Sequence, residues 1–289
     1  MRHHLLAVLA AVVAVDAFAP MSGVRVTKVK GGEEVDLGER LASSKSGKTL
    51  LVLGTYAADF NAIEYGQRVK HYLPALKEKG VEDVCVVFNA NPASCDALAS
   101  ILDLPEEVEI LSDPMGAAGK AFDVGRGWLP DDDSISPYAK LFGMLVGLGA
   151  PMTLPYVIAG YIGNPGGKAG WIETSLAVGQ RKGRWPDMAL DLDGATGKVA
   201  SNSFNDLPIV GGWGRRPLEL ATLRLQNMMG ISIANWGELA PDEEQLKAGV
   251  LTQLGGCVVI EGSTGEAAFE WKDPGICAVA SFDDMLAAI

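Results

Sequence analysis

The fold of this chain is decided by the stretch TLLVLGTYAADFNAIE, which spans residues 49–64. Residues 49–54 form a continuous apolar run, which predicts a strand buried on both faces. A helical pattern with one apolar stripe follows from Asn61 to Lys79, and Gly80 ends it. The connecting loop, residues 55–60, is therefore expected where a buried strand ends and a helix begins.

The pattern of strands and helices continues along the chain. Further strands are predicted at 83–88 and 108–111, and further helices at 92–102 and 115–122. Near the C-terminus, strands at 257–260 and 267–271 flank a glycine turn, and a helix at 281–289 closes the chain. Ser281 and Asp284 at the start of this helix are in near capping-box spacing. The first five elements imply a parallel core with right-handed crossovers. Because a β-α-β unit is followed later by a β-β-α unit, the predicted fold class is α/β with a thioredoxin-like fold.

The loop resembles the active-site segment of the peroxiredoxins, in which a buried strand is followed by the pattern Y-P-A-D-F-T-x-V-C. The residues that match as they stand are Tyr56, Ala58, Asp59 and Phe60. Three residues depart from the pattern, because Ala57 replaces proline, Asn61 replaces threonine and Glu64 replaces the peroxidatic cysteine. The resemblance therefore places a candidate site in this loop, but this sequence lacks the cysteine that serves as nucleophile in the family.

The C-terminal part carries a second resemblance. Residues 253–260, QLGGCVVI, and residues 269–273, FEWKD, look like the end of the peroxiredoxin-like 2 group of the alkyl hydroperoxide reductase / thiol-specific antioxidant family. The resemblance covers about residues 50–125 and 245–289. The segment between them looks like that of long plastid and cyanobacterial members, in runs such as KLFGMLVGLG at 140–149. The resemblance implies a thioredoxin-like fold and a link to redox and antioxidant chemistry.

Glu64 admits two interpretations. In the family a cysteine stands there because the first turn of a helix stabilises a thiolate. A carboxylate is stabilised in the same way, but it cannot attack an O–O bond as a thiolate does. The structural interpretation pairs Asn61 with Glu64 as a capping box, in which each side chain satisfies the other's backbone N–H. The functional interpretation gives Glu64 a ligand-binding or acid–base role.

The four cysteines offer an alternative site of thiol chemistry. No pair has C-x-x-C spacing, which excludes a zinc ribbon and a standard dithiol motif. Cys85 lies in an apolar run and is expected to be buried in a strand. Cys257 and Cys277 lie at the two ends of the predicted hairpin and would form a redox pair if their Cα atoms came within about 7 Å. The alternative is that both are unrelated packing residues.

The N-terminal residues read as a targeting sequence. Residues 1–17 have a basic start and an apolar run, as in a secretory signal peptide. Residues 18–30 begin Phe-Ala-Pro and hold no acid, and they resemble the transit segment of proteins imported into complex plastids. We therefore expect a plastid protein, with ordinary secretion as the alternative. The rest of the chain divides into residues 31–124 and 250–289, the two thioredoxin-like halves, and residues 125–249, a mostly helical insertion.

The charge and the apolar pattern of the chain limit the classes of partner that it can bind. The net charge of −12 without a long basic run argues against a nucleic-acid partner. Leu141 to Ile162 holds no charged residue, but its glycines and prolines predict two short helices with a bend. Such a hairpin would pack on the core, line an apolar pocket or contact a thylakoid membrane peripherally. The expected function is a non-peroxidatic module that binds a plastid protein or an apolar ligand without a cofactor or metal. The alternative is a thiol oxidoreductase that uses Cys257 or Cys277.

Overall fold

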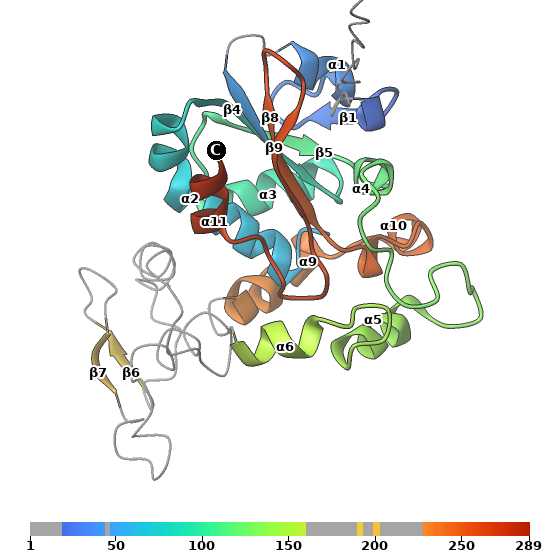
Figure 1. Cartoon of the computed structure of the whole chain (residues 1–289). Coiled ribbons are helices and arrows are strands. Elements are labelled where there is room, and N and C mark those ends of the chain that lie inside the picture. The colour runs from blue at the N-terminus through green and yellow to red at the C-terminus, as the bar shows by residue number, and fades with distance from the viewer. Residues whose placement is uncertain (1–18, 44–46, 160–189, 193–198, 203–227) are drawn as a thin grey trace, which may run out of the picture.

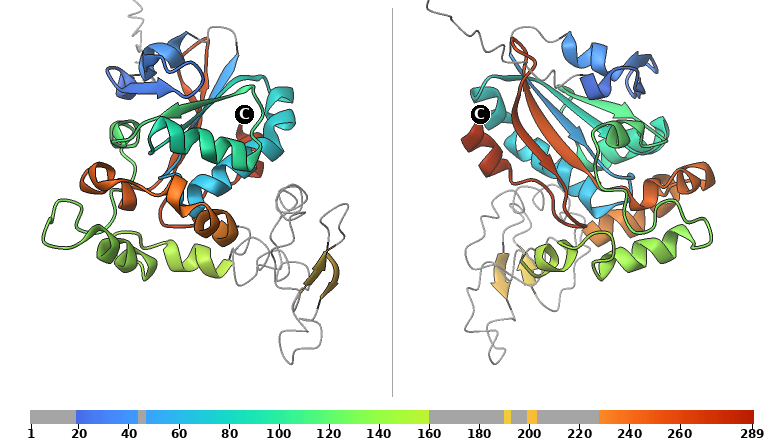
Figure 2. Two further views of the ribbon diagram at one scale, coloured as in Figure 1. Left: turned by 180° about the vertical axis from the view of Figure 1, so that it is seen from behind. Right: turned by 45° about the vertical axis from the view of Figure 1, so that its right-hand side comes forward.

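The computed structural model describes residues 19–43, 47–159, 190–192, 199–202 and 228–289. The predicted signal peptide, residues 1–17, lies outside these ranges. The chain is an α/β protein built on a seven-stranded mixed sheet with helices on both faces (Figures 1 and 2). This architecture agrees with the α/β class that the sequence predicts.

The sheet has a parallel centre and antiparallel margins. Its centre consists of β3 (Lys48–Leu53), β4 (Val81–Phe88) and β5 (Val108–Ser112). The hairpin of β8 (Gly256–Glu261) and β9 (Ala267–Lys272) joins the outer edge of β3. On the other side, β1 (Arg25–Lys28) pairs with β5, and β2 (Glu34–Asp36) pairs with β1. The strand order is β2-β1-β5-β4-β3-β8-β9.

Strand β3 explains why the apolar run in the sequence is continuous. Leu50 and Val52 face one core layer, whereas Leu51 and Leu53 face the other. The first layer packs against α2 (Phe60–Glu78), α3 (Pro92–Leu102) and α11 (Phe282–Ala288). The opposite layer packs against α1 (Leu37–Ala42), the 3-10 helix η1 (Ala19–Met21) and α4 (Ala117–Ala121). Both faces of the strand are therefore buried, as predicted.

The seven-stranded sheet includes two strands that the sequence analysis did not predict. Strands β1 and β2 were missed because each is only three or four residues long. β1 falls within the segment 18–30 that we interpret as a transit segment. Met21 and Val26 of that segment are buried in the second core layer. These residues are therefore part of the folded domain.

Local capping explains where the helices begin. Helix α3 has proline at its first position, and the Asn91 side chain accepts from the Ser94 N–H. Helix α11 is capped by Ser281, whose hydroxyl accepts from the Asp284 N–H, at the spacing that the sequence predicted. Helix α4 begins only at Ala117, two residues later than predicted, because Gly116 before it adopts a left-handed conformation.

The described part of segment 125–249 contains short helices joined by turns and loops, and one strand pair. It contains α5 (Pro137–Leu145), α6 (Thr153–Val157), α9 (Trp236–Leu239), α10 (Glu243–Lys247) and the strand pair β6 (Leu190–Leu192) and β7 (Val199–Asn202). The two short helices predicted for the apolar segment are confirmed as α5 and α6. They are separated by a bend that contains Gly147 and Gly149, both in the left-handed region. Among the described residues, no helix combines the length and apolarity that a membrane span requires.

Candidate functional site

The loop predicted as the candidate site lies at the end of β3, beside the end of β4. The Asn89 N–H donates to the Thr55 carbonyl at 3.1 Å, which fixes the loop to the neighbouring strand. Tyr56, Ala57 and Ala58 are buried. The Ser232 hydroxyl donates to the Ala58 carbonyl at 2.7 Å, so a segment from far along the chain covers the loop. The predicted loop therefore exists, but it is enclosed by other parts of the protein.

A buried carboxylate organises the start of α2. Asp273 follows β9 and is only 2% exposed. Its Oδ1 accepts from the Tyr65 hydroxyl at 2.6 Å and from Trp271 Nε1 at 3.0 Å, and its Oδ2 accepts from Asn61 Nδ2 at 3.0 Å. Gly255 lies so close that an added Cβ would stand 2.9 Å from Asp273 Oδ2. The carboxylate is thus held by side chains from α2 and from β9.

Asn61 connects α2 to the segment that follows Asp273, residues 273–281, which we call the C-terminal strap. Its Nδ2 donates to Asp273, and its Oδ1 accepts from the Cys277 N–H at 2.8 Å. The capping box predicted for Asn61 and Glu64 is therefore wrong. Helix α2 already begins at Phe60, with Asp59 at the N-cap position, so the Asn61 side chain is used for a tertiary contact instead.

Glu64, at the position where the resemblance predicts a cysteine, is buried and holds an ion pair. Its Oε1 lies 2.5 Å from a terminal nitrogen of Arg68, one helical turn further along α2. The other terminal nitrogen of Arg68 donates to the Ala280 carbonyl at 2.6 Å. The Arg68 guanidinium therefore binds Glu64 on one side and the C-terminal strap on the other. Glu64 thus helps, through Arg68, to hold the strap against α2.

Two carboxyl groups near the start of α2 have raised pKa values. Burial raises the pKa of Asp59 to about 6. Burial raises the pKa of Asp273 to about 7, against the opposing effect of its three hydrogen bonds, and the nearby Asp59 charge raises it further. Such groups exchange protons near neutral pH, which is the property expected of an acid–base pair or of a structural switch.

The cysteines are buried throughout. All four lie in described residues, and none forms a disulfide. Burial raises the pKa of the Cys95 thiol to about 12 and holds those of Cys85 and Cys257 well above the usual range. Cys257 belongs to the core around α2, whereas Cys277 belongs to a small cluster with Met144 and Ala150. A raised thiol pKa and burial both oppose thiolate chemistry.

Sequence reasoning found part of this site. The predicted site residues lie in the loop before α2 and in its first turns: Tyr56, Asp59, Phe60, Asn61 and Glu64. Asp273 and Trp271 were noted only as part of the C-terminal motif, and Tyr65 lies in the apolar stripe of the helix predicted from Asn61 to Lys79. The cluster around Asp273 has one sequence signal, an acidic residue directly after a strand whose last residues include a tryptophan.

Comparisons with known proteins return no relative. No family model, no curated protein and no solved structure matches this chain.

Proposed function

We propose that this chain is a peroxiredoxin-like protein with a thioredoxin-type fold that binds a partner and does not reduce peroxide. The observation that carries the proposal is the state of position 64, where a buried carboxylate is paired with Arg68 and fastened to the C-terminal strap. The strand order β4-β3-β8-β9, formed by a β-α-β unit and a β-β-α unit, supports the fold assignment. The burial of all four cysteines supports the lack of thiol chemistry.

The alternative, an oxidoreductase that uses Cys257 or Cys277, has less support. The two thiols belong to different packing clusters, and neither is exposed. One observation does favour it, because Cys277 has a φ of +63°, and strained backbone of this kind recurs at functional sites.

A peroxidase assay separates the two functions. We expect purified protein with thioredoxin and thioredoxin reductase to consume hydrogen peroxide no faster than the assay blank. Turnover that disappears in Cys257→Ser or Cys277→Ser would establish the oxidoreductase instead. Turnover that survives both changes would point to Cys85 or Cys95 and equally contradict the proposal.

For the partner, we propose an apolar surface that meets the outer face of α5. Tyr138, Phe142, Leu145 and Val146 recur at the spacing of one helix face, and all are exposed, Phe142 by 72%. The inner face of the same helix packs Leu141 and Met144 into the protein. A helix that is apolar on opposite faces is normally covered on both. Since residues 141–162 carry no charge, a lipid bilayer in the plastid is the partner that we favour.

Vesicle binding tests this surface. We expect the protein to co-sediment with neutral phosphatidylcholine vesicles, with little dependence on salt because the surface is uncharged. Phe142→Ser combined with Val146→Ser should abolish co-sedimentation. Met115→Ser, which changes an exposed methionine on the loop before α4, is the matched control. Equal binding by the double variant would exclude α5 as the contact.

Plastid targeting is proposed from residues 1–20. Cleavage after Ala17 would remove the signal peptide and leave η1 and β1 in place, as the sheet requires. A fluorescent reporter fused after Pro20 should reach the plastid, and Phe18→Ala should stop it outside the stroma. Secretion of the unmutated reporter would overturn the assignment.

A further inference from the structure

The apolar surface on α5 continues onto other elements at the same end of the molecule. Apart from Met115, every exposed large apolar side chain of the described residues lies in residues 129–158 or 233–236. Figures 1 and 2 show α5, α6 and α9 together at the end of the molecule opposite α1. We call the exposed apolar side chains of these two ranges the apolar end. Besides those of α5, they are Leu129, Leu148, Met152, Leu154, Ile158, Ile233 and Trp236.

The apolar end is fixed to the rest of the protein through the C-terminal strap. The Ile276 N–H donates to the Thr153 hydroxyl at 3.1 Å, and the Met152 N–H donates to the Pro274 carbonyl at 3.4 Å. Thr153 is fully buried, and a Cβ added to Gly275 would stand 2.5 Å from its backbone nitrogen. The exposed side chains of α6 therefore project outward from a helix whose inner side is already packed. Large exposed apolar surfaces of this kind mark contacts with a protein or a membrane.

No cation is exposed on the described elements that carry the apolar end. Residues 129–159 contain one basic residue, Lys140, which is buried and donates to the Pro130 carbonyl at 3.3 Å. Residues 228–240 contain no basic residue. Both ranges do contain acidic residues, which are Asp131, Asp132 and Asp133 directly before α5 and Glu238 in α9.

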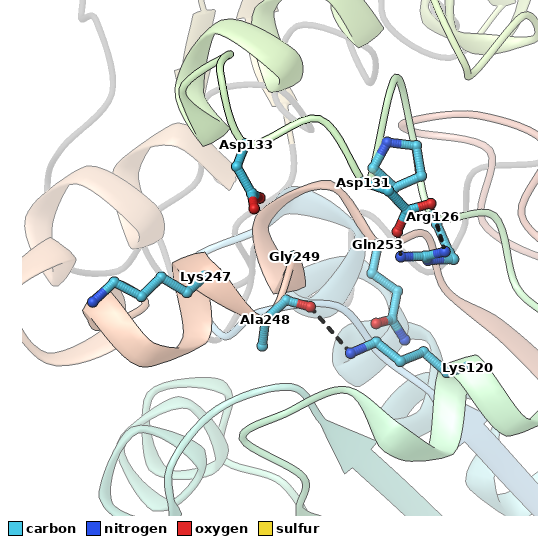
Figure 3. Close-up of a pocket in the computed structure, with 9 residues that line it drawn as sticks. Lys120, Arg126, Asp131, Asp133, Lys247, Ala248, Gly249 and Gln253 are labelled. Carbon is cyan, nitrogen blue, oxygen red and sulfur yellow. Dashed lines mark hydrogen bonds and ion pairs between the residues drawn. The ribbon is translucent and has the colours of Figure 1, made fainter.

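These acidic residues leave the apolar end with an excess of negative charge. Asp131 is paired with Arg126 (Figure 3), but Asp132 and Asp133 form no ion pair with another described residue. Lys247 of α10 lies near the same loop, and Figure 3 shows its side chain directed away from Asp133. Exposed charges act over about 10 Å at 0.1 M ionic strength, so anionic headgroups that approach α5 are repelled.

The lack of cations determines how this end can bind a bilayer. A surface helix is attracted by anionic lipids through its basic residues and by all lipids through the burial of its apolar face. Only the second attraction is available here. Bulky side chains such as Phe142 and Trp236 enter the bilayer most easily through gaps between headgroups, and binding of this kind depends on curvature because curvature opens such gaps.

We propose that the apolar end selects strongly curved bilayers of uncharged lipids and is repelled by anionic bilayers. The inference rests on the bilayer contact proposed above for α5, and it names the class of bilayer. Insertion of the apolar side chains of α5, α6 and α9 would supply the attraction. Asp132, Asp133 and Glu238 would supply the discrimination against anionic headgroups.

Flotation of the full chain with three kinds of vesicle tests the proposal. The probes are phosphatidylcholine vesicles of about 30 nm, vesicles of the same lipid of about 200 nm, and vesicles of about 30 nm with roughly 30% phosphatidylglycerol. We expect the partition coefficient to be at least about tenfold higher for the small than for the large phosphatidylcholine vesicles. Phosphatidylglycerol should lower it at least about threefold, and about 0.5 M salt should remove that difference.

The outcomes separate this inference from the contact on which it rests. A protein that floats with none of the vesicles would overturn the bilayer contact and this inference together. Binding that is independent of vesicle size, or that rises with phosphatidylglycerol, would overturn the inference alone and leave the bilayer contact standing.

Variants identify the part of the chain that binds, since residues 1–17 are also apolar. Leu154→Ser combined with Ile158→Ser should lower the partition into small phosphatidylcholine vesicles at least about fivefold, whereas the control Met115→Ser should not. Equal binding by the α6 variant and the wild type would contradict the assignment.

A charge added to α5 tests the discrimination between lipids. Ala139 is exposed and lies three residues before Phe142, on the same side of the helix. Ala139→Lys should therefore make phosphatidylglycerol raise the partition coefficient, whereas the uncharged control Ala139→Gln should respond as the wild type does. An unchanged response in Ala139→Lys would show that this face does not meet the headgroups and would overturn the proposal.

Discussion

The substitution Asp273→Asn tests the buried carboxylate directly, because it keeps the shape of the side chain and removes its charge. Three donors converge on Asp273, two on Oδ1 and one on Oδ2. An asparagine retains only one acceptor oxygen. If that oxygen serves Tyr65 and Trp271, its NH₂ group faces Asn61 Nδ2, and Asn61 cannot turn over because its Oδ1 accepts from the Cys277 N–H. One buried donor then loses its partner, which costs about 1–3 kcal/mol of unfolding free energy.

The pH dependence of the free energy of unfolding distinguishes the cost of the lost hydrogen bond from the cost of burying the Asp273 charge. Burial raises the pKa of Asp273 from 3.8 to about 7, so the folded state holds its proton more tightly than the unfolded state does. The stability from this proton is therefore fully present below pH 3.8 and is lost as the pH rises to about 7. Between pH 5 and pH 8 the loss in the wild type amounts to about 2–3 kcal/mol, and Asp273→Asn does not undergo it.

Urea unfolding at pH 5, 6, 7 and 8, followed by circular dichroism, measures the difference. We expect the stability of the variant relative to the wild type to rise by about 2–3 kcal/mol from pH 5 to pH 8. Titrating groups that do not interact with Asp273 cancel because they behave alike in both proteins, whereas Asp59, which is coupled to Asp273, contributes to the measured difference. The reasoning is refuted if the difference is independent of pH, or if it moves against the variant as the pH rises, since either result means that Asp273 does not carry a raised pKa.

Three further predictions concern the core. Arg68→Met should destabilise the protein by about 3–5 kcal/mol, because it leaves the buried Glu64 carboxylate without its guanidinium partner. Adding Glu64→Leu should restore most of the lost stability, and urea unfolding measures both effects. Gly119→Ala should cost about 1–3 kcal/mol because its Cβ overlaps the Gln253 amide, whereas the control Gly237→Ala, which meets no atom within 4 Å, should be neutral or stabilising in the same assay. The four buried cysteines should react with a thiol reagent only as fast as the protein unfolds, and rapid labelling of any of them in native buffer would contradict their burial.

Much of the fold follows from local pattern. The apolar run at 49–54 predicted β3, because a strand buried on both faces needs apolar residues at consecutive positions. The spacing of Ser281 and Asp284 predicted the start of α11, because a cap is formed between residues three apart. Glycines and prolines predicted that the apolar segment from Leu141 would break into α5 and α6. In each case the groups that decide the structure are close together in the sequence.

The candidate site was decided by tertiary structure. Asn61 and Asp273 are 212 residues apart, and no local pattern indicates that the amide of one would face the carboxylate of the other. The same holds for Arg68 and Ala280. Because of their contact, Glu64 does not cap the helix as predicted but helps to hold the C-terminal strap through Arg68. The sequence by itself determined the central strands of the sheet, the helices that follow them, and that position 64 lacks a thiol. Only the packing of distant segments decided the partners of its buried polar groups, because burial removes water and forces each group to find a donor or acceptor within the protein.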